Sequence, residues 1–214
     1  MLKRKFLILC HDASTDGAFT LDDLPGSGGR IDVAARCVVA SLLISYGIRK
    51  DAEVILFFCK GPRNGLTIRV SGNNVKYLNP DERSTAALLR NAMLKYKNVA
   101  MESSPGVEVC TTNLETILAG EKNVYYLKEE GFPAGNFEFP DEEILFVLGD
   151  HKDLTPEEET IVLKYAKAKL SISPLSLYSE QCITIIHNIL DRKFSGRFIP
   201  ENREHKSVDR NDGK

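Results

Sequence analysis

Three charged residues near the amino terminus have the types and spacing to handle an anionic substrate. Arg30, Asp32 and Arg36 follow a glycine-rich segment, residues 26–29, and open a stretch with helical periodicity. An arginine guanidinium can donate two hydrogen bonds to a phosphate, and an aspartate can accept a proton during a reaction. Because Asp32 and Arg36 are four residues apart, a plain salt bridge on a helix explains that pair equally well.

A second candidate site lies in residues 170–192. An apolar run ends at Ile172, a loop rich in serine follows, and apolar residues then recur at three- and four-residue steps between Tyr178 and Leu190. This pattern predicts a strand, a tight loop and a helix. In open α/β sheets small ligands bind at such loops, although an ordinary strand–helix connection has the same pattern.

Strand-like apolar runs alternate with helix-like periodic segments along the whole chain. We expect strands at residues 6–10, 53–59, 66–70, 75–78, 107–110, 123–127, 144–148 and 168–172. We expect helices at residues 30–46, 79–96, 114–119, 155–168 and 178–192, with Asn79 and Thr155 as caps. This alternation indicates an α/β protein with a mostly parallel sheet covered by helices on both faces.

The composition is that of a globular protein with little excess charge. Hydrophobic residues make up 43% and charged residues 27% of the 214 residues, and the net charge is −2. This excludes a globally basic nucleic-acid binder, so any RNA contact must use a local basic patch. We expect residues 1–192 to form one domain and residues 193–214, which have few apolar groups, to be a charged and disordered tail.

The five cysteines form no CxxC pair, and most of them stand in apolar runs. Such cysteines are typical of small core residues in a reducing compartment, so we expect a cytoplasmic protein. No metal site is suggested, and the apolar runs are too short to cross a bilayer. The first residues lead directly into a strand-like run, which is not the pattern of a signal peptide.

Four stretches, taken together and in this order, resemble one family. They are residues 23–37, 78–84, 146–151 and 171–188, with the sequences DLPGSGGRIDVAARC, LNPDERS, FVLGDH and SISPLSLYSEQCITIIHN. The combination resembles the archaeal tRNA (pseudouridine-54, N1)-methyltransferases of the SPOUT superfamily. The resemblance covers nearly all of residues 1–192.

The resemblance implies a parallel α/β sheet whose carboxyl-terminal part forms a deep trefoil knot, a topology that is rare among proteins. It also implies a homodimer with S-adenosylmethionine bound in the knot. The family's cofactor positions carry over to Leu127, Gly149, Ile172, Ser173, Pro174, Leu175, Ser176, Leu177 and Cys182. At Gly149 we expect the missing side chain to let the backbone approach the cofactor closely.

The activity implied by the resemblance is methyl transfer to N1 of a pseudouridine in the T-loop of tRNA, after the base has been turned out of its stack. Asp32 is the candidate to take the N1 proton, a role that water can also fill. Expected RNA contacts are Arg30, Arg36 and Arg83. His151 and His187 are expected to make structural hydrogen bonds. Asp12 departs from the family pattern, in which a basic residue follows the histidine.

Two alternative functions stay open. One is methylation of pseudouridine in ribosomal RNA by an enzyme of the same superfamily. The other is a non-catalytic RNA-binding α/β protein, which the intact loop at residues 172–177 disfavours.

Overall fold

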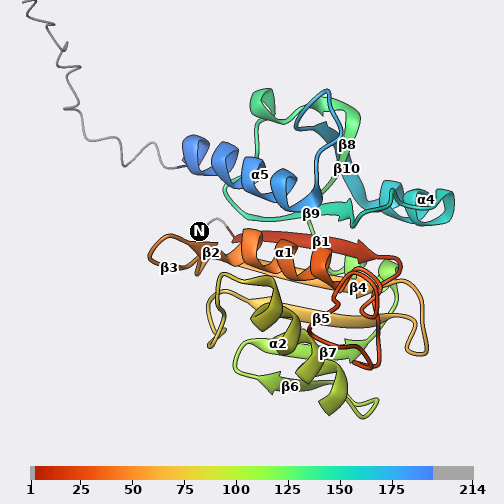
Figure 1. Ribbon diagram of the computed structural model, residues 1–214. Helices are drawn as coiled ribbons and strands as arrows, with labels where there is room; N and C mark the ends of the chain where they lie inside the picture. The colour runs from red at the N-terminus through yellow and green to blue at the C-terminus, as the bar shows by residue number, and fades with distance from the viewer. Residues whose placement is uncertain (1–2, 195–214) are drawn as a thin grey trace, which may run out of the picture.

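An eight-stranded sheet forms the centre of the computed structural model, which describes residues 3–194 (Figure 1). The strand order is β10-β8-β9-β1-β4-β5-β7-β6. The first five strands in this order are parallel: β10 (Ala166–Ser171), β8 (Val124–Pro133), β9 (Glu143–Gly149), β1 (Lys3–Cys10) and β4 (Ala52–Phe58). The last three pair antiparallel: β5 (Leu66–Ser71), β7 (Val107–Thr111) and β6 (Met101–Ser104). The prediction of a mostly parallel sheet is confirmed.

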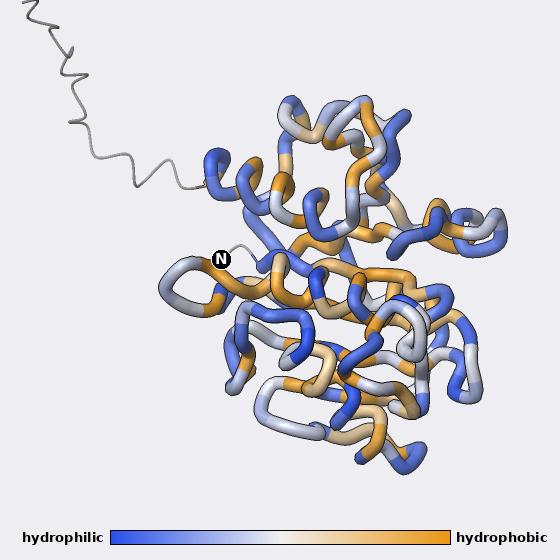
Figure 2. The backbone as a smooth tube through the Cα atoms, viewed as in Figure 1, coloured by the Kyte–Doolittle hydropathy of each residue, from blue (hydrophilic) through white to orange (hydrophobic). Residues whose placement is uncertain are grey.

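Helices cover both faces of this sheet. On one face pack α1 (Ile31–Leu42), α2 (Glu82–Lys95) and α5 (Ser179–Phe194), and on the other pack α3 (Leu114–Ala119) and α4 (Pro156–Tyr165). Alternate residues of β1 belong to the two cores, Phe6 and Ile8 to the first and Leu7 and Leu9 to the second, because successive side chains point to opposite faces. Figure 2 shows hydrophobic residues concentrated along the central strands.

Two predictions about the first half of the chain are wrong. The first helix ends at Leu42, where a hairpin of β2 (Leu43–Ile44) and β3 (Gly47–Ile48) begins. The Leu42 carbonyl oxygen accepts a hydrogen bond from the Arg49 amide at 2.7 Å, which directs the chain out of the helix. Residues 75–78 form no strand. They follow a turn at residues 72–74, and Tyr77 has a left-handed backbone with a φ of 62°.

Long-range pairing also changed the strands of the second half. Strand β6 was not predicted from the sequence, and it pairs with β7 at one edge of the sheet. Strand β8 extends to Pro133, beyond the expected residue 127, because its last residues pair with β10. The short 3₁₀ helix η1 (Ala134–Asn136) follows it.

The capping predictions gave mixed results. The capping box at Thr155 is confirmed, and its helix ends at Tyr165 instead of about residue 168. Helix α2 begins two residues later than expected, since the cap is Asp81 and not Asn79. The Asp81 side chain accepts a hydrogen bond from the Ser84 amide at 2.8 Å.

The end of α5 marks the limit of the described chain. This helix reaches Phe194, so all but two residues of the tail predicted at residues 193–214 lie outside the described residues. Within residues 3–194, no helix combines the length and the apolar character needed to cross a bilayer. The five cysteines are free.

Candidate functional site

A cavity of about 630 Å³ opens at the carboxyl ends of β9 and β10 and beside the middle of β8. Its walls are the end of β9 with the segment after it (residues 148–154), the loop after β10 with the first turn of α5, and the beginning of α1. Parallel strands end at the same edge of a sheet, so loops that are far apart in the sequence meet there. This is the position at which a small ligand was expected.

The cavity brings the predicted cofactor residues together. The predicted residues that line it are Leu127, Gly149, Ile172, Ser173, Leu175, Ser176, Leu177 and Cys182. Pro174 belongs to the same loop but is not part of the lining. The grouping agrees with the expected positions, while the role of each residue in holding a cofactor stays a prediction.

Hydroxyl groups connect the walls of the cavity. The Ser179 Oγ atom, at the start of α5, lies 2.9 Å from the carbonyl oxygen of Gly149 and 2.6 Å from that of Asp150. In the loop after β10, the Leu175 amide donates to the Ser173 Oγ atom at 3.0 Å. The contacts of Ser179 thereby fix the loop between β10 and α5 to the end of β9. Some of the serines predicted as part of the site therefore stabilise the shape of this loop.

Gly149 is required by its own turn. A Cβ atom at this position would overlap the carbonyl oxygen of Lys152, well inside the 3.0 Å that real Cβ contacts keep. The sequence-based reason for this glycine was close approach to the cofactor. The structure gives a nearer one, since the backbone of residues 149–152 turns back on itself at the cavity wall.

The charged residues after the glycine-rich segment form one network. Asp32 is buried, with 4% of its surface exposed. Its Oδ1 atom accepts from Arg30 Nε at 3.1 Å, and its Oδ2 atom accepts from Arg30 Nη2 at 3.2 Å and from Arg36 Nη1 at 2.9 Å. Arg36 also donates to Glu180 on α5 and to Glu82 on α2. Arg36 therefore joins three helices, and the predicted Asp32–Arg36 ion pair is only part of its contacts.

This network places arginines, and not the aspartate, at the cavity. Arg30 and Arg36 line the cavity, and Asp32 lies behind them. Although burial favours the neutral acid, the hydrogen bonds from Arg30 and Arg36 lower the pKa of Asp32. Arg30 has a left-handed backbone, with a φ of 73°, directly before α1. A non-glycine residue held in that region stores strain, which is common at functional sites.

Arg83, the other predicted RNA contact, lies apart from this network. Its exposed side chain pairs with Asp22 at 2.5 Å and does not line the cavity. Asp12, the departure from the family pattern, pairs with Lys152 and lies 3.1 Å from His151 Nε2. Lys152, from another segment, thus brings a positive charge next to Asp12, the position at which the resemblance predicts a basic residue.

The lining also includes residues that the sequence did not single out. Tyr126, Leu148 and Leu154 add apolar surface, and Glu129 and Glu180 add negative charge. The Glu180 Oε2 atom is buried and has no hydrogen-bond partner among the described residues. The expected cofactor, S-adenosylmethionine, combines an apolar adenine ring with a cationic methionine part. A mixed cavity with an unpaired carboxylate oxygen suits those two parts.

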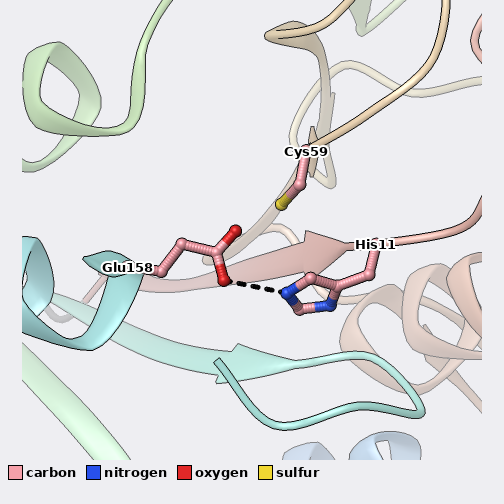
Figure 3. Close-up of side chains that lie close together, drawn as sticks. All are labelled: His11, Cys59 and Glu158. Atoms are coloured by element: carbon pink, nitrogen blue, oxygen red, sulfur yellow. Dashed lines mark hydrogen bonds and ion pairs between the residues drawn. The ribbon is translucent and has the colours of Figure 1, made fainter. Parts of the chain in front are cut away.

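A buried histidine, also missed, lies beside the cavity wall. Figure 3 shows His11, Cys59 and Glu158 pointing toward one another from three different segments. Their possible ligand atoms lie within 4.8 Å of one another, a spacing that a metal ion could bridge. Both ring nitrogens of His11 are instead engaged by carboxylates, Nδ1 with Asp150 at 3.1 Å and Nε2 with Glu158 at 2.9 Å. Hydrogen bonds to two carboxylates therefore occupy both ring nitrogens of His11.

The comparison of folds agrees with this architecture. The chain is similar to the crystal structure of Archaeoglobus fulgidus Nep1 bound to S-adenosylhomocysteine, with a TM-score of 0.64 and 16% sequence identity. The match covers 89% of this chain and 98% of that structure. At this level of identity the similarity shows a shared fold.

Sequence comparison is more specific. The chain is 41% identical over 192 residues to the tRNA (pseudouridine(54)-N(1))-methyltransferase of Methanosarcina acetivorans, covering 88% of this chain and 91% of the relative. It is 39% identical over 202 residues to the protein of the same name from Haloferax volcanii, covering 91% and 100%. Residues 3–194 match the family described as "Putative SAM-dependent RNA methyltransferase". The chain therefore belongs to this family of RNA methyltransferases, the family of the archaeal tRNA (pseudouridine(54)-N(1))-methyltransferases.

Proposed function

We propose that this protein transfers the methyl group of S-adenosylmethionine to N1 of pseudouridine 54 in tRNA. The observation that carries the proposal is the coincidence of two lines of evidence. The relatives that match the chain over nearly its whole length have this activity in their names, and the predicted cofactor residues line one cavity. The ribosomal RNA alternative has no comparable support from these relatives.

The cofactor supplies a methyl group that is already activated on a sulfonium. The protein therefore has to bind the cofactor and the target base, orient them toward each other and exclude water. The loop after β10 and the end of β9 would hold the cofactor, and Arg30 and Arg36 line the same cavity. Their positive charges would stabilise the ring of the target base as its N1 atom loses a proton.

Asp32 serves mainly to aim the two arginines. Each of its oxygens already accepts from a guanidinium, and its lowered pKa makes it a weak base. Water is then the acceptor of the N1 proton, one of the two options that the sequence left open.

A homodimer is part of the proposal. An apolar groove of about 690 Å³ lies between α1 and α5, lined by Val39, Ala40, Leu177 and Ile185 among others, and Arg36 and Glu180 line both this groove and the cavity. A second copy covering the groove would close the site from that side. Sedimentation should show a dimer for the natural protein and a monomer for Ile185→Arg, whereas a monomeric natural protein would contradict the assembly.

The carboxyl-terminal trefoil knot is likewise proposed from the family. The contact of Ser179 with Gly149 and Asp150, and the packing of α5 against α1, agree with a chain that passes back through its own loop. The cytoplasmic location expected from the free cysteines stays a prediction.

The decisive experiment is a methyl-transfer assay with radiolabelled S-adenosylmethionine. The substrates are tRNA with pseudouridine at position 54, the same tRNA with uridine there, and a ribosomal RNA fragment that contains pseudouridine. We expect label only in the first, with N1-methylpseudouridine identified by mass spectrometry. Label only in the ribosomal fragment would establish the first alternative. Failure to bind the cofactor in calorimetry would establish the non-catalytic one.

A further inference from the structure

His11 follows the last residue of β1 and holds two other segments. Its backbone amide donates to Asp150 Oδ2 at 2.9 Å, and its ring faces Asp150 Oδ1 at 3.1 Å and Glu158 Oε2 at 2.9 Å. The ring is 3% exposed, and the Asp150 side chain is 2% exposed. Glu158 belongs to the first turn of α4, where its Oε2 atom also accepts from the Thr155 amide at 2.8 Å.

These contacts fix the wall of the cofactor cavity from behind, because Asp150 is part of the lining and its partners His11 and Glu158 are not. Residues 149–154 line the cavity, and they connect β9 to the start of α4. Asp150 anchors one end of this segment to His11, and Glu158 anchors the helix at its other end. His11 itself is absent from the lining. It can therefore affect a ligand only through the position of the segment.

Both contacts need a doubly protonated ring. A carboxylate accepts hydrogen bonds, so each of the two nitrogens must carry a proton. The hydrogen bond with Asp150 raises the pKa of His11, and Glu158 adds to this against the effect of burial. In a neutral ring one nitrogen would face a carboxylate with its lone pair. When the ring loses a proton, we expect the hydrogen bond to Glu158 to break first. Asp150 is the more buried of the two carboxylates, and it also accepts a hydrogen bond from the His11 amide.

The other titratable groups near the His11 ring do not supply the positive charge between Asp150 and Glu158. Burial raises the pKa of Cys10 on β1 and of Cys59 after β4, so both thiols stay neutral. His151 lies 3.2 Å from Asp150 and 3.1 Å from Asp12 on the exposed side, and Lys152 pairs with Asp12.

We infer that His11 is a positioning residue for the cofactor site. Its charged ring clamps residues 149–154 between β1 and α4 in the conformation that binds S-adenosylmethionine. The inference rests on the proposed assignment of the cavity as the cofactor site. His11 itself lies outside the lining of the cavity.

The clamp has a predictable dependence on pH. A group whose pKa is raised by folding contributes fully below its ordinary pKa of 6.5 and loses its contribution as the pH rises through the raised value. Cofactor affinity should therefore be constant at mildly acidic pH and fall above the raised pKa of His11. The cofactor's own amino group also titrates in the alkaline range, so a variant without His11 is needed as reference.

The experiment is calorimetric titration of the full-length protein with S-adenosylmethionine between about pH 5.5 and 9, for the natural chain, His11→Gln and Glu158→Gln. We expect His11→Gln to bind roughly ten- to a hundredfold more weakly at pH 6, the range for losing hydrogen bonds to charged groups, with a flat profile below the cofactor's own titration. Glu158→Gln removes one carboxylate, so the fall in affinity should move to lower pH. Cys59→Ser, which alters a neighbour of Glu158 outside the clamp, should match the natural chain.

Three results separate the possible outcomes. No binding by the natural chain at any pH would overturn the cofactor site itself, and with it this inference. Binding with a pH profile that is the same in the natural chain and Glu158→Gln would overturn the clamp alone, even if His11→Gln does not fold. Proton–nitrogen NMR spectra of the histidine rings provide the independent readout, and a His11 ring that is neutral at pH 6 would also overturn the inference.

Discussion

Each end of β1 carries a cluster of charged residues around a histidine, and the two histidines differ in their charge state. At the amino end, Arg4 donates to Asp191 at 2.7 Å, pairs with Asp51 at 2.9 Å and lies 3.2 Å from His187 Nδ1. At the carboxyl end, His11 lies between Asp150 and Glu158. Both clusters join β1 to segments more than a hundred residues away in the sequence. Only the second cluster borders the cavity.

The contrast between the two histidines shows how neighbouring charge decides the state of a buried ring. Burial, followed by the cations of Arg49 and Arg4, lowers the pKa of His187 to about 3. The ring is neutral, accepts from Arg4 and donates to the Ser41 carbonyl oxygen at 2.9 Å. This confirms the structural role expected for His187. Carboxylates raise the pKa of His11 and favour its charged form, and a charged ring can hold a ligand-binding loop in place.

We expect the largest effect from Gly149→Leu, which changes the cavity wall near the carboxyl end of β1. We expect loss of measurable S-adenosylmethionine binding with a folded protein, because any side chain here displaces the Lys152 carbonyl and the cavity wall. Calorimetry measures the binding, and circular dichroism checks the fold. The matched control is Gly135→Ala, whose added Cβ meets no atom within 4 Å. Full affinity in Gly149→Leu would mean that the wall can move without consequence.

At the amino end, Arg4→Met should damage stability and leave the site intact. Removing the guanidinium leaves the partly exposed carboxylates of Asp51 and Asp191 without this partner, and the loss of hydrogen bonds to charged groups costs about 1.5–3 kcal/mol. Urea unfolding measures the loss. Cofactor affinity of the folded variant should equal that of the natural chain. A large fall in affinity would show that the two ends of β1 are coupled.

The variant Asp32→Asn tests whether a side chain of the cavity region also acts as a base. If Asp32 aims Arg30 and Arg36, cofactor affinity should be normal, and kcat/KM for tRNA should fall roughly ten- to a hundredfold, since a charge-assisted contact is weakened. The shape of the pH–rate profile should not change. A true base would lose roughly 10²- to 10⁴-fold in kcat together with the acidic limb of the profile. That second result would restore Asp32 as the catalytic residue.

The smallest expected effect concerns the acid stability given by His187. Its folded pKa of about 3 lies below the ordinary 6.5, so its contribution is present above pH 6.5 and is lost as the pH falls toward 3. At pH 5 the loss amounts to about 2 kcal/mol relative to neutral pH, from about 1.4 kcal/mol per pH unit. In His187→Gln, unfolding free energies should decline less between pH 6.5 and 5. An equal decline would assign the acid sensitivity to other groups.

Much of this molecule follows from local patterns in the chain. The apolar runs of β1, β4 and β9 are found as buried strands, α3 has the predicted bounds, and the capping box of Thr155 forms. These features depend on neighbouring residues, so periodicity and capping rules detect them. The predicted cofactor residues group in one cavity for a related reason, since strand ends of a parallel sheet share an edge.

Sequence alone determined the α/β class, the family and the segments that form the cavity, because apolar periodicity and short motifs are properties of adjacent residues. Tertiary structure decided what those residues can do. The separation of His11 from Asp150 is 139 residues and from Glu158 is 147 residues, and no local pattern joins them. Hydrogen bonds from two arginines keep the buried Asp32 ionised, and burial together with the cations of Arg49 and Arg4 keeps His187 neutral. Charge state depends on the three-dimensional neighbours of a group, and the folded sheet alone brings those neighbours together.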